Sequence, residues 1–258
     1  DDPVHLAHSK RFGPYWSVTK YKDILAVDTD HATYSSDAHL GGISLAERPA
    51  PEVFPSFIAM DPPRHDEQRK TVSPIVAPAN LARLEGTIRE RAARILDGLP
   101  IGETFDWVPR VSIELTTQML ATLFDFPFDE RHLLTWWSDM ATGDPAGNGP
   151  VTSWEQRQAE LGKCQDCFTR LWNERVNAEP RNDLISMLAH SPATRHMSPQ
   201  EYLGNLILLI VGGNDTTRNS ISGGLLALNR FPDEYDKLRA NPALVESMVP
   251  EIIRWQTP

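Results

Sequence analysis

The chain has 258 residues, of which 40% are hydrophobic, and it carries a formal net charge of −10 at pH 7. This length is enough for one large domain, or two smaller ones, with a sizeable core. The acidic balance argues against a general nucleic-acid binder, which needs a basic face, and the longest apolar run, residues 206–211, is too short to cross a bilayer.

The first part of the chain, up to about residue 60, carries the only good strand signals. Residues 15–18 follow a Gly-Pro turn and predict a strand, with which residues 5–7 can pair. A short helix fits residues 21–27. Residues 40–60 predict a long loop that is rich in Gly and Pro and also apolar, with Ile43, Leu45, Phe54, Phe57, Ile58 and Met60. An apolar loop of this length is typical of a lid or of a poorly ordered segment.

The remainder, from about residue 61 to 258, predicts an almost entirely helical structure, so the expected fold class is mainly α with a small β region near the N-terminus. Apolar spacing and capping signals predict helices at 62–76, 80–98, 108–124, 129–141, 152–178, 182–189, 199–229, 233–239 and 242–255. Residues 142–151 contain three glycines and two prolines, which predict a flexible connector.

The segment 61–69, Asp-Pro-Pro-Arg-His-Asp-Glu-Gln-Arg, begins the helical part. Asp61 is a candidate cap for a helix whose first position is Pro62. His65 and Arg69 are four residues apart and therefore share one helix face, where the two cationic donors suit a carboxylate. Taken alone, the segment fits an ordinary solvated helix end better.

Cys164 and Cys167 form one Cys-x-x-Cys inside the helix predicted at 152–178. A zinc site needs two more ligands, and a redox motif needs a strand–helix context. We therefore favour packed or partly exposed thiols on one helix face. Two cysteines without a disulfide framework indicate a reducing compartment, the cytoplasm.

The helix predicted at 199–229 starts with strong signals. Ser198 is a good N-cap, Pro199 suits the first helical position, and Glu201 can reach back in a capping box. Residues 206–217, Leu-Ile-Leu-Leu-Ile-Val-Gly-Gly-Asn-Asp-Thr-Thr, then place glycines, a carboxylate and hydroxyls in its middle. Each glycine there costs about 1 kcal/mol relative to Ala, and such local conflicts tend to mark functional sites.

Two interpretations of this turn carry equal weight. The hydroxyls of Thr216 and Thr217 can bond the carbonyls of Gly212 and Gly213, which would open the helix beside a groove and let Asp215 act in a proton relay. The alternative is a close helix crossing at the glycines, with Asp215 paired to a neighbouring Arg.

Near the end of the chain, Glu251 and Arg254 lie three residues apart on a mostly apolar helix. They can form a buried ion pair, or else a common surface pair worth a few tenths of a kcal/mol. Pro250 lies inside the same predicted helix, where it removes a hydrogen bond and should kink the chain.

In this order and spacing, the three segments resemble the cytochromes P-450, the haem-thiolate monooxygenases, and the resemblance covers essentially the whole chain. His65 and Arg69 match the family's His-x-x-x-Arg, which binds the haem propionates. Residues 212–216 match its Ala/Gly-Gly-x-Asp/Glu-Thr, which lies over the distal haem face. Glu251 and Arg254 match its Glu-x-x-Arg, a structural pair behind the haem.

Finer details of the sequence look most like one bacterial subfamily. The run at 60–65, Met-Asp-Pro-Pro-Arg-His, is typical of bacterial members. Residues 124–128, 213–219 and 255–258 resemble the subfamily that hydroxylates the terminal carbon of medium-chain alkanes and fatty acids.

The resemblance implies the cytochrome P-450 fold, truncated at both ends, with residues 1–258 as a single partial domain, and haem b as the cofactor. The family's axial cysteine lies in Phe-x-x-Gly-x-x-x-Cys-x-Gly, which is expected beyond Pro258. Neither Cys164 nor Cys167 has that context, so this stretch is expected to contain no metal ligand and to be inactive by itself.

The resemblance also implies roles for individual residues. Thr216 and Asp215 become catalytic residues that deliver protons to dioxygen. Gly212 and Gly213 join His65 and Arg69 as haem-binding positions. The substrate pocket is implied to be lined by Leu208, Val211 and Gly212.

The implied partners are a small lipophilic substrate, dioxygen, and a ferredoxin with its ferredoxin reductase, which bring electrons from NAD(P)H. An acidic ferredoxin would be steered to a basic cluster, formed here by Arg64, Arg69, Lys70, Arg83, Arg89, Arg91 and Arg94. No nucleic acid and no transmembrane segment are expected. The alternatives are the same haem chemistry on a sterol or terpenoid and, from a different class, a helical binding protein without a cofactor.

Overall fold

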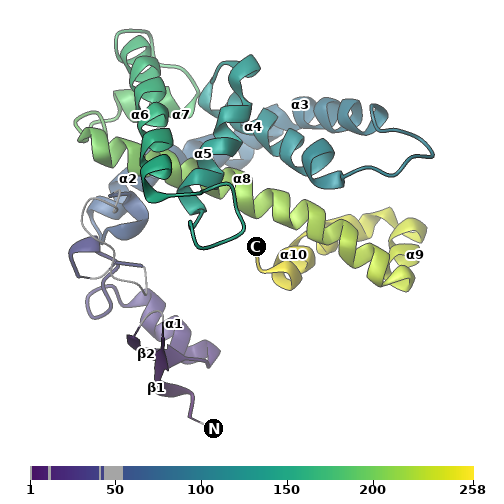
Figure 1. The fold of residues 1–258 in the computed structure, drawn as a ribbon, viewed down its shortest axis with the longest axis horizontal. Helices are drawn as coiled ribbons and strands as arrows, with labels where there is room; N and C mark the ends of the chain where they lie inside the picture. The colour runs from purple at the N-terminus through teal and green to yellow at the C-terminus, as the bar shows by residue number, and fades with distance from the viewer. Residues whose placement is uncertain (1, 11–12, 41, 44–54) are drawn as a thin grey trace.

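The computed structural model describes residues 2–10, 13–40, 42–43 and 55–258. A body of helices is built around one long helix, α8 (Pro199–Arg230). A small N-terminal hairpin and a short helix lie to one side of this body (Figure 1). The predicted fold class, mainly α with a small β region, is confirmed.

The hairpin consists of two antiparallel strands, β1 (Val4–Ser9) and β2 (Gly13–Val18). Val4 pairs with Val18, and Ser9 pairs with Gly13, which has the positive φ of 72° that glycine adopts readily at a tight turn. Helix α1 (Tyr21–Thr29) follows. The predicted strands and short helix are confirmed, with longer bounds.

Only part of the predicted apolar loop lies within the described residues. Leu45 and Phe54 fall outside them, so the lid prediction is untested there. The end of the loop forms a single 3-10 turn, η3 (Phe57–Ala59), in which Phe57 is buried. Met60, directly after it, is buried too.

Each helix predicted in the second part of the chain has a counterpart. The helices are α2 (Arg64–Val72), α3 (Pro78–Asp97), α4 (Glu114–Phe124), α5 (His132–Thr142), α6 (Trp154–Val176), α7 (Leu184–His190), α8, α9 (Pro232–Ala240) and α10 (Val245–Gln256). Short turns join them: the 3-10 turns η4 (Ser73–Val76), η6 (Phe128–Glu130) and η7 (Pro242–Leu244), and the π-helical turn η5 (Val108–Ile113). A further 3-10 turn, η1 (Ala38–Leu40), follows α1. Four predicted helices, 62–76, 108–124, 129–141 and 242–255, therefore divide into a helix and one such turn.

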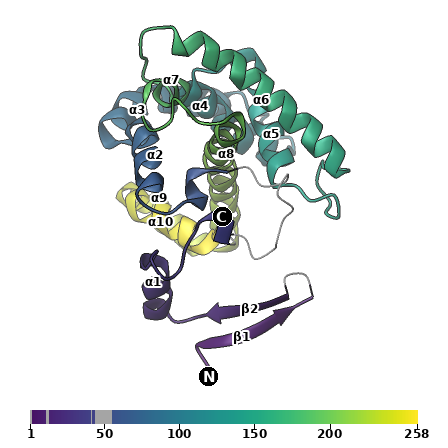
Figure 2. The ribbon, with the colours of Figure 1, turned by 90° about the vertical axis from the view of Figure 1, so that its left-hand side faces the viewer.

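The core surrounds the first half of α8. Helices α2 and α3 lie on one side of α8, and α5 and α6 lie on the other (Figure 2). Leu203, Leu206 and Ile210 of α8 are buried in this core. Phe168 of α6 meets Phe124 at the end of α4 edge to face, with ring centroids 5.5 Å apart. Full burial of each such side chain contributes roughly 1.5–3 kcal/mol.

The start of α8 confirms one capping prediction and corrects another. The Ser198 hydroxyl accepts a hydrogen bond from the Glu201 amide at 3.1 Å, and Pro199 occupies the first turn. The Glu201 carboxylate does not close a capping box. It accepts hydrogen bonds from Arg64 and Gln68 of α2, because that helix packs within reach.

The prediction that α2 is capped by Asp61 is wrong. The helix begins at Arg64, and the Asp61 carboxylate accepts hydrogen bonds from the Ser35 hydroxyl and the Ser36 amide. These bonds favour the charged carboxylate and hold the pKa of Asp61 below its usual value. Asp61 therefore joins two loops. Within the part of the chain that the structure describes, no helix is long and apolar enough to cross a membrane.

Candidate functional site

The glycine–threonine turn lies in the middle of α8, which remains α-helical from Pro199 to Arg230. The Thr216 hydroxyl donates a hydrogen bond to the Gly212 carbonyl at 2.9 Å, as predicted. The predicted opening of the helix at this turn is wrong. The Thr216 hydroxyl bonds a carbonyl four residues back without displacing the helical bonds, which is the ordinary behaviour of a mid-helix threonine.

The two glycines of this turn face different surroundings. A Cβ atom at Gly213 would come within 2.6 Å of Leu120 Cδ2 in α4. At Gly212, no atom lies within 4 Å of the position that a Cβ would take. The predicted close helix crossing therefore occurs at Gly213, whereas Gly212 leaves open space along α8.

Asp215 lies at one end of a row of three charged side chains. Its carboxylate pairs with Arg218 of the same helix, and Arg218 also pairs with Asp139 of α5 at 2.8 Å. The predicted pairing with a neighbouring Arg is confirmed. Burial raises the pKa of Asp215 above its ordinary value, Arg218 opposes this increase, and Asp139 adds to it.

A polar contact behind the turn fixes α8 against α4. Asn214 is fully buried, and its side-chain oxygen accepts a hydrogen bond from the Thr116 hydroxyl at 3.0 Å. Two turns further on, the hydroxyls of Ser222 and Ser112 lie 2.8 Å apart. These contacts and the steric contact at Gly213 set the rotation of α8. That rotation leaves Gly212 and Thr216 exposed in a helix whose earlier turns are buried.

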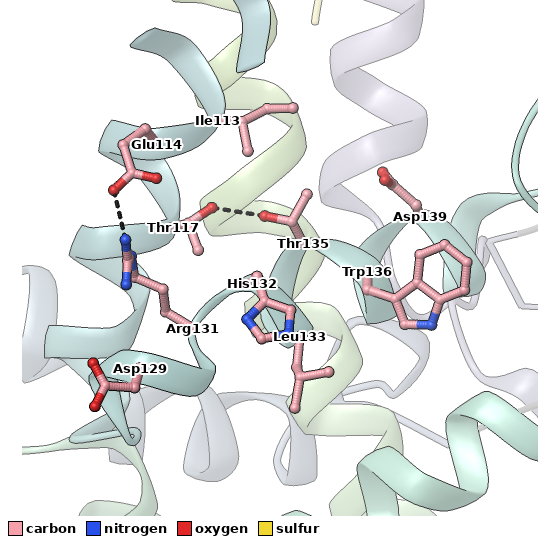
Figure 3. A pocket seen from close by; sticks show the side chains of 10 residues that line it. All are labelled: Ile113, Glu114, Thr117, Asp129, Arg131, His132, Leu133, Thr135, Trp136 and Asp139. Carbon is pink, nitrogen blue, oxygen red and sulfur yellow. Dashed lines mark hydrogen bonds and ion pairs between the residues drawn. The ribbon is translucent and has the colours of Figure 1, made fainter. Parts of the chain in front are cut away.

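A cavity of about 700 Å³ lies between α4 and α5 (Figure 3). Glu114 and Arg131 form an ion pair of 2.9 Å on one side of it, and the hydroxyls of Thr117 and Thr135 are 2.6 Å apart between the helices. Asp139 lines its other side. The cavity therefore reaches the carboxylate that shares Arg218 with Asp215. The sequence indicated an Arg for Asp215 without identifying it as Arg218, and it missed Asp139, because α5 supplies that carboxylate from a distant part of the chain.

The predicted substrate-lining residues border the exposed turn. Leu208 and Val211 are half-buried, and Gly212 is exposed. A second cavity of about 390 Å³ lies among α8, α9 and α10 and opens beside Gly224 and Trp255. Neither of these two cavities is lined by the three predicted residues.

His65 and Arg69 lie on α2, as predicted. His65 is half-buried and its Nδ1 donates to the Phe57 carbonyl at 2.8 Å, whereas Arg69 is exposed. Helix α2 meets α8 through bonds to Glu201 and Asn205. Since Asn205 precedes Gly212 by seven residues, α2 joins α8 about two turns before the glycine–threonine turn.

Glu251 and Arg254 form a bidentate ion pair, with Arg254 Nε and Nη2 at 2.7 and 2.6 Å from the two carboxylate oxygens. Their side chains are 59% and 68% exposed, so the surface pair is the arrangement that occurs here. Helix α10 continues through Pro250. It packs on α8, where a Cβ at Gly224 would come within 2.8 Å of an Ile252 side-chain atom.

The two cysteines behave as predicted for packed thiols. Cys164 is buried and Cys167 is half-buried on one face of α6. Burial raises the pKa of both thiols. Among the described residues, no group of three or more His, Cys, Asp or Glu side chains is placed to hold a metal ion.

Much of the predicted basic cluster is engaged in local contacts. Arg64, Arg89 and Arg94 form ion pairs with nearby glutamates. Arg91 donates to the Gln118 carbonyl and the Thr122 hydroxyl of α4. These contacts leave a narrower basic surface than the sequence suggests.

Comparison with known proteins gives consistent similarities. No protein-family model matches the chain. The solved structure of CYP153D17 from Sphingomonas sp. PAMC 26605 is 49% identical, with a TM-score of 0.88 over 99% of this chain and 64% of that one. The predicted fold is thereby confirmed.

Two curated relatives match with lower identity. Linalool 8-monooxygenase from Pseudomonas putida is 32% identical over 100% of this chain and 65% of its own length. Methyl-branched lipid omega-hydroxylase from Mycobacterium tuberculosis is 29% identical over 95% of this chain and 58% of its own length. The chain thus spans less than two thirds of each of these relatives.

Proposed function

Because the chain belongs to the cytochromes P-450, we propose that it is part of a haem-dependent monooxygenase that hydroxylates an unactivated C–H bond of a lipophilic substrate. The finer proposal is terminal hydroxylation of medium-chain alkanes or fatty acids, with electrons from NAD(P)H through a ferredoxin. The observation that carries this proposal is the exposed turn of α8, where Gly212 has no side chain and Thr216 presents a hydroxyl.

The residues of this turn fit haem b, the cofactor of the family. A flat group can approach the helix closely where no atom lies within 4 Å of a Cβ built on Gly212. His65 donates from Nδ1 to the Phe57 carbonyl, and in its imidazolium form Nε2–H would donate to a haem propionate as well. Arg69 offers a second, permanently charged donor on the same helix face. When bound, haem supplies the activation of dioxygen and the oxidation of the C–H bond.

We assign proton delivery to Asp215 and Thr216. A hydroxyl can donate one hydrogen bond while it accepts others. The Thr216 hydroxyl can therefore accept a hydrogen bond from a proton donor, and it can pass its own proton to a ligand once it breaks its bond to the Gly212 carbonyl. Burial raises the pKa of Asp215, so this carboxyl holds a proton more readily than an exposed aspartate does. Arg218 keeps it oriented.

The substrate proposal rests on the apolar border of the turn. Leu208 and Val211 precede Gly212 on α8 and would line an apolar slot. Such a slot discriminates by only about 1–3 kcal/mol per methylene, so several chain lengths should be accepted. The relative named as a methyl-branched lipid omega-hydroxylase supports a lipid substrate that is hydroxylated at its end. The relative named for linalool supports the second candidate, a terpenoid.

We propose that an acidic ferredoxin docks beside α2, on the part of the basic cluster that remains once the ion-paired arginines and Arg91, which is bonded to α4, are set aside: Arg69, Lys70 and Arg83. Charge steering of this kind accelerates association and weakens as salt rises. Reduction of the full-length enzyme by the ferredoxin should therefore slow with ionic strength and after Arg83→Glu. Glu174→Lys on α6, which changes a charge elsewhere, is the control.

Substrate titrations of the full-length, haem-loaded enzyme test the proposal. Octane and a medium-chain fatty acid should shift the haem absorption spectrum, and mass spectrometry should find the new hydroxyl on the terminal carbon. A response to linalool or a steroid alone would instead support the terpenoid or sterol candidate. A full-length protein that is purified without haem and does not take it up would support the cofactor-free binding protein.

A further inference from the structure

A buried chain of polar side chains joins three elements near the start of α8. The Phe57 amide of η3 donates to Asn205 Oδ1 at 2.8 Å. Asn205 Nδ2 donates to Gln68 Oε1 of α2 at 3.0 Å, and Gln68 Nε2 donates to Glu201 Oε1 at 2.6 Å. Asn205 is fully buried, and Gln68 is 2% exposed. Buried amides of this kind are costly unless every polar atom finds a partner.

The two ends of this row of hydrogen-bonded side chains fix the direction of every hydrogen bond in it. The Phe57 amide can only donate, and the Glu201 carboxylate can only accept while it pairs with Arg64 at 2.7 Å. Asn205 must therefore turn its oxygen towards Phe57, and Gln68 must turn its oxygen towards Asn205. Only one orientation of the two side-chain amides lets every hydrogen bond form. We call this hydrogen-bonded connection between η3, α2 and α8 the lock.

The lock closes one end of the exposed turn. On an α-helix, residues seven and eleven positions after Asn205 return to its face within about 20°. These residues are Gly212 and Thr216, which are exposed, whereas the Asn205 end of the same face is covered by η3. The distance along the helix from Asn205 to Gly212 is about 10 Å. A ligand lying on the exposed turn thus has η3 at one end.

We infer that Asn205 and Gln68 are positioning residues that hold the segment from Phe57 to Met60 as an end wall of the substrate chamber and so set the chain-length preference. The inference rests on the proposed function, since it takes the exposed turn to be the site of the substrate. His65 contributes to the same wall through the Phe57 carbonyl. Loosening the wall lengthens the slot and weakens discrimination between chain lengths.

Asn205→Asp tests the lock with almost no change in volume. The introduced carboxylate cannot donate to Gln68, so two oxygens face each other at one junction of the chain. Hydrogen exchange of the segment 55–60, measured on the full-length enzyme without substrate, should become on the order of tenfold faster. The ratio of kcat/KM between the best n-alkane and its neighbours in the series should fall towards one, with kcat less affected than KM.

A second substitution should restore the lock. In Asn205→Asp with Glu201→Gln, the Gln68 amide can turn over, donate to position 205 and accept from position 201, so every junction pairs again. Slow exchange and chain-length discrimination should both return. The matched control is Asn229→Asp, at an exposed position of α8, which should change neither.

The outcomes separate the inference from the proposed function. Unchanged exchange in Asn205→Asp, or no recovery in the double variant, overturns the lock whatever the substrate is. Faster exchange with unchanged chain-length discrimination overturns its role in specificity. If the full-length enzyme oxidises no linear chain, the proposed substrate class fails, and the exchange measurements still decide whether the lock exists.

Discussion

Two turns of α8 carry polar side chains on the same helix face, and they use them in opposite ways. At Asn205 the side chain is fully buried and its hydrogen bonds reach η3 and α2. At Thr216 the side chain is exposed, and its hydroxyl is bonded within its own helix. The first turn fixes neighbouring elements, whereas the second keeps a donor and acceptor available to a ligand.

The difference follows from what each turn meets. In the first half of α8, apolar neighbours exclude water, so a polar side chain there must find protein partners. In the middle, Gly213 brings α8 against α4 on one side while Gly212 leaves the other side open. A single helix can therefore provide both a rigid support and an open surface within about three turns.

The largest expected change in the free energy of unfolding comes from the core next to Asn205. Leu206→Ala should lower the free energy of unfolding by about 2–5 kcal/mol, because Leu206 is fully buried and its removal leaves a cavity. Leu226→Ala, at a position of α8 that is 51% exposed, should change it by less than about 0.5 kcal/mol. Urea unfolding of the full-length protein measures both. Equal losses would contradict the contrast between the two halves of α8.

The two glycines provide the next test. Gly213→Ala forces a methyl group against Leu120, and overpacking of this kind costs about 1–3 kcal/mol, of which the better helix propensity of Ala returns about 1 kcal/mol. Gly212→Ala meets open space in the protein without haem and should stabilise that form by up to about 1 kcal/mol. Melting temperatures of the two variants should thus move in opposite directions. A loss in both would show that Gly212 is also sterically constrained.

The local features of α8 could be predicted from the sequence, because both partners lie within one helical turn. The Ser198 cap and the bond from Thr216 to Gly212 are of this kind. The capping box failed because Glu201 has stronger partners in Arg64 and Gln68. Those partners lie more than 130 residues earlier in the chain, and no local pattern encodes such a contact.

The same limit applies to the site. The sequence predicted where the turn lies, but it could not tell which glycine meets a neighbouring helix and which borders open space. Packing decides which face of α8 meets α4. It indicated an Arg for Asp215 but not the third member, Asp139, which α5 supplies. A polar residue inside the buried run of residues 202–206 was the available signal for Asn205. The resemblance to the cytochromes P-450 supplied the fold.

A smaller effect on stability is expected from Asp215→Asn, and it depends on pH. The folded protein raises the pKa of Asp215, so it binds this proton more tightly than the unfolded chain does. Asp215 therefore lowers the free energy of unfolding progressively as the pH rises from the pKa of this residue in the unfolded chain to its pKa in the folded protein. The difference in melting temperature, variant minus wild type, should become more positive across this range. A constant difference would mean that Arg218 fully compensates for burial.

The smallest effect on stability, and the most informative for function, is expected from Thr216→Ala. The residue is exposed and its hydroxyl bonds only a carbonyl that already serves the helix, so the melting temperature should hardly change. Electron entry does not involve this side chain, so the full-length enzyme should still oxidise NADH. If Thr216 passes protons, product formed per NADH oxidised should fall several-fold, and hydrogen peroxide should account for the remaining electrons.

Asp215→Asn gives the contrast that identifies the role of Thr216. It removes the ionisable group but keeps the size of the side chain and the hydroxyl next to it, so turnover should slow while coupling suffers less. A purely structural role for both residues predicts the reverse: lower melting temperatures in both variants with coupling unchanged. Thr217→Ala, the exposed hydroxyl one position further along, is the matched control and should leave coupling intact. Unchanged coupling in Thr216→Ala would remove this side chain from proton delivery and leave Asp215 as the remaining candidate for that role in the turn.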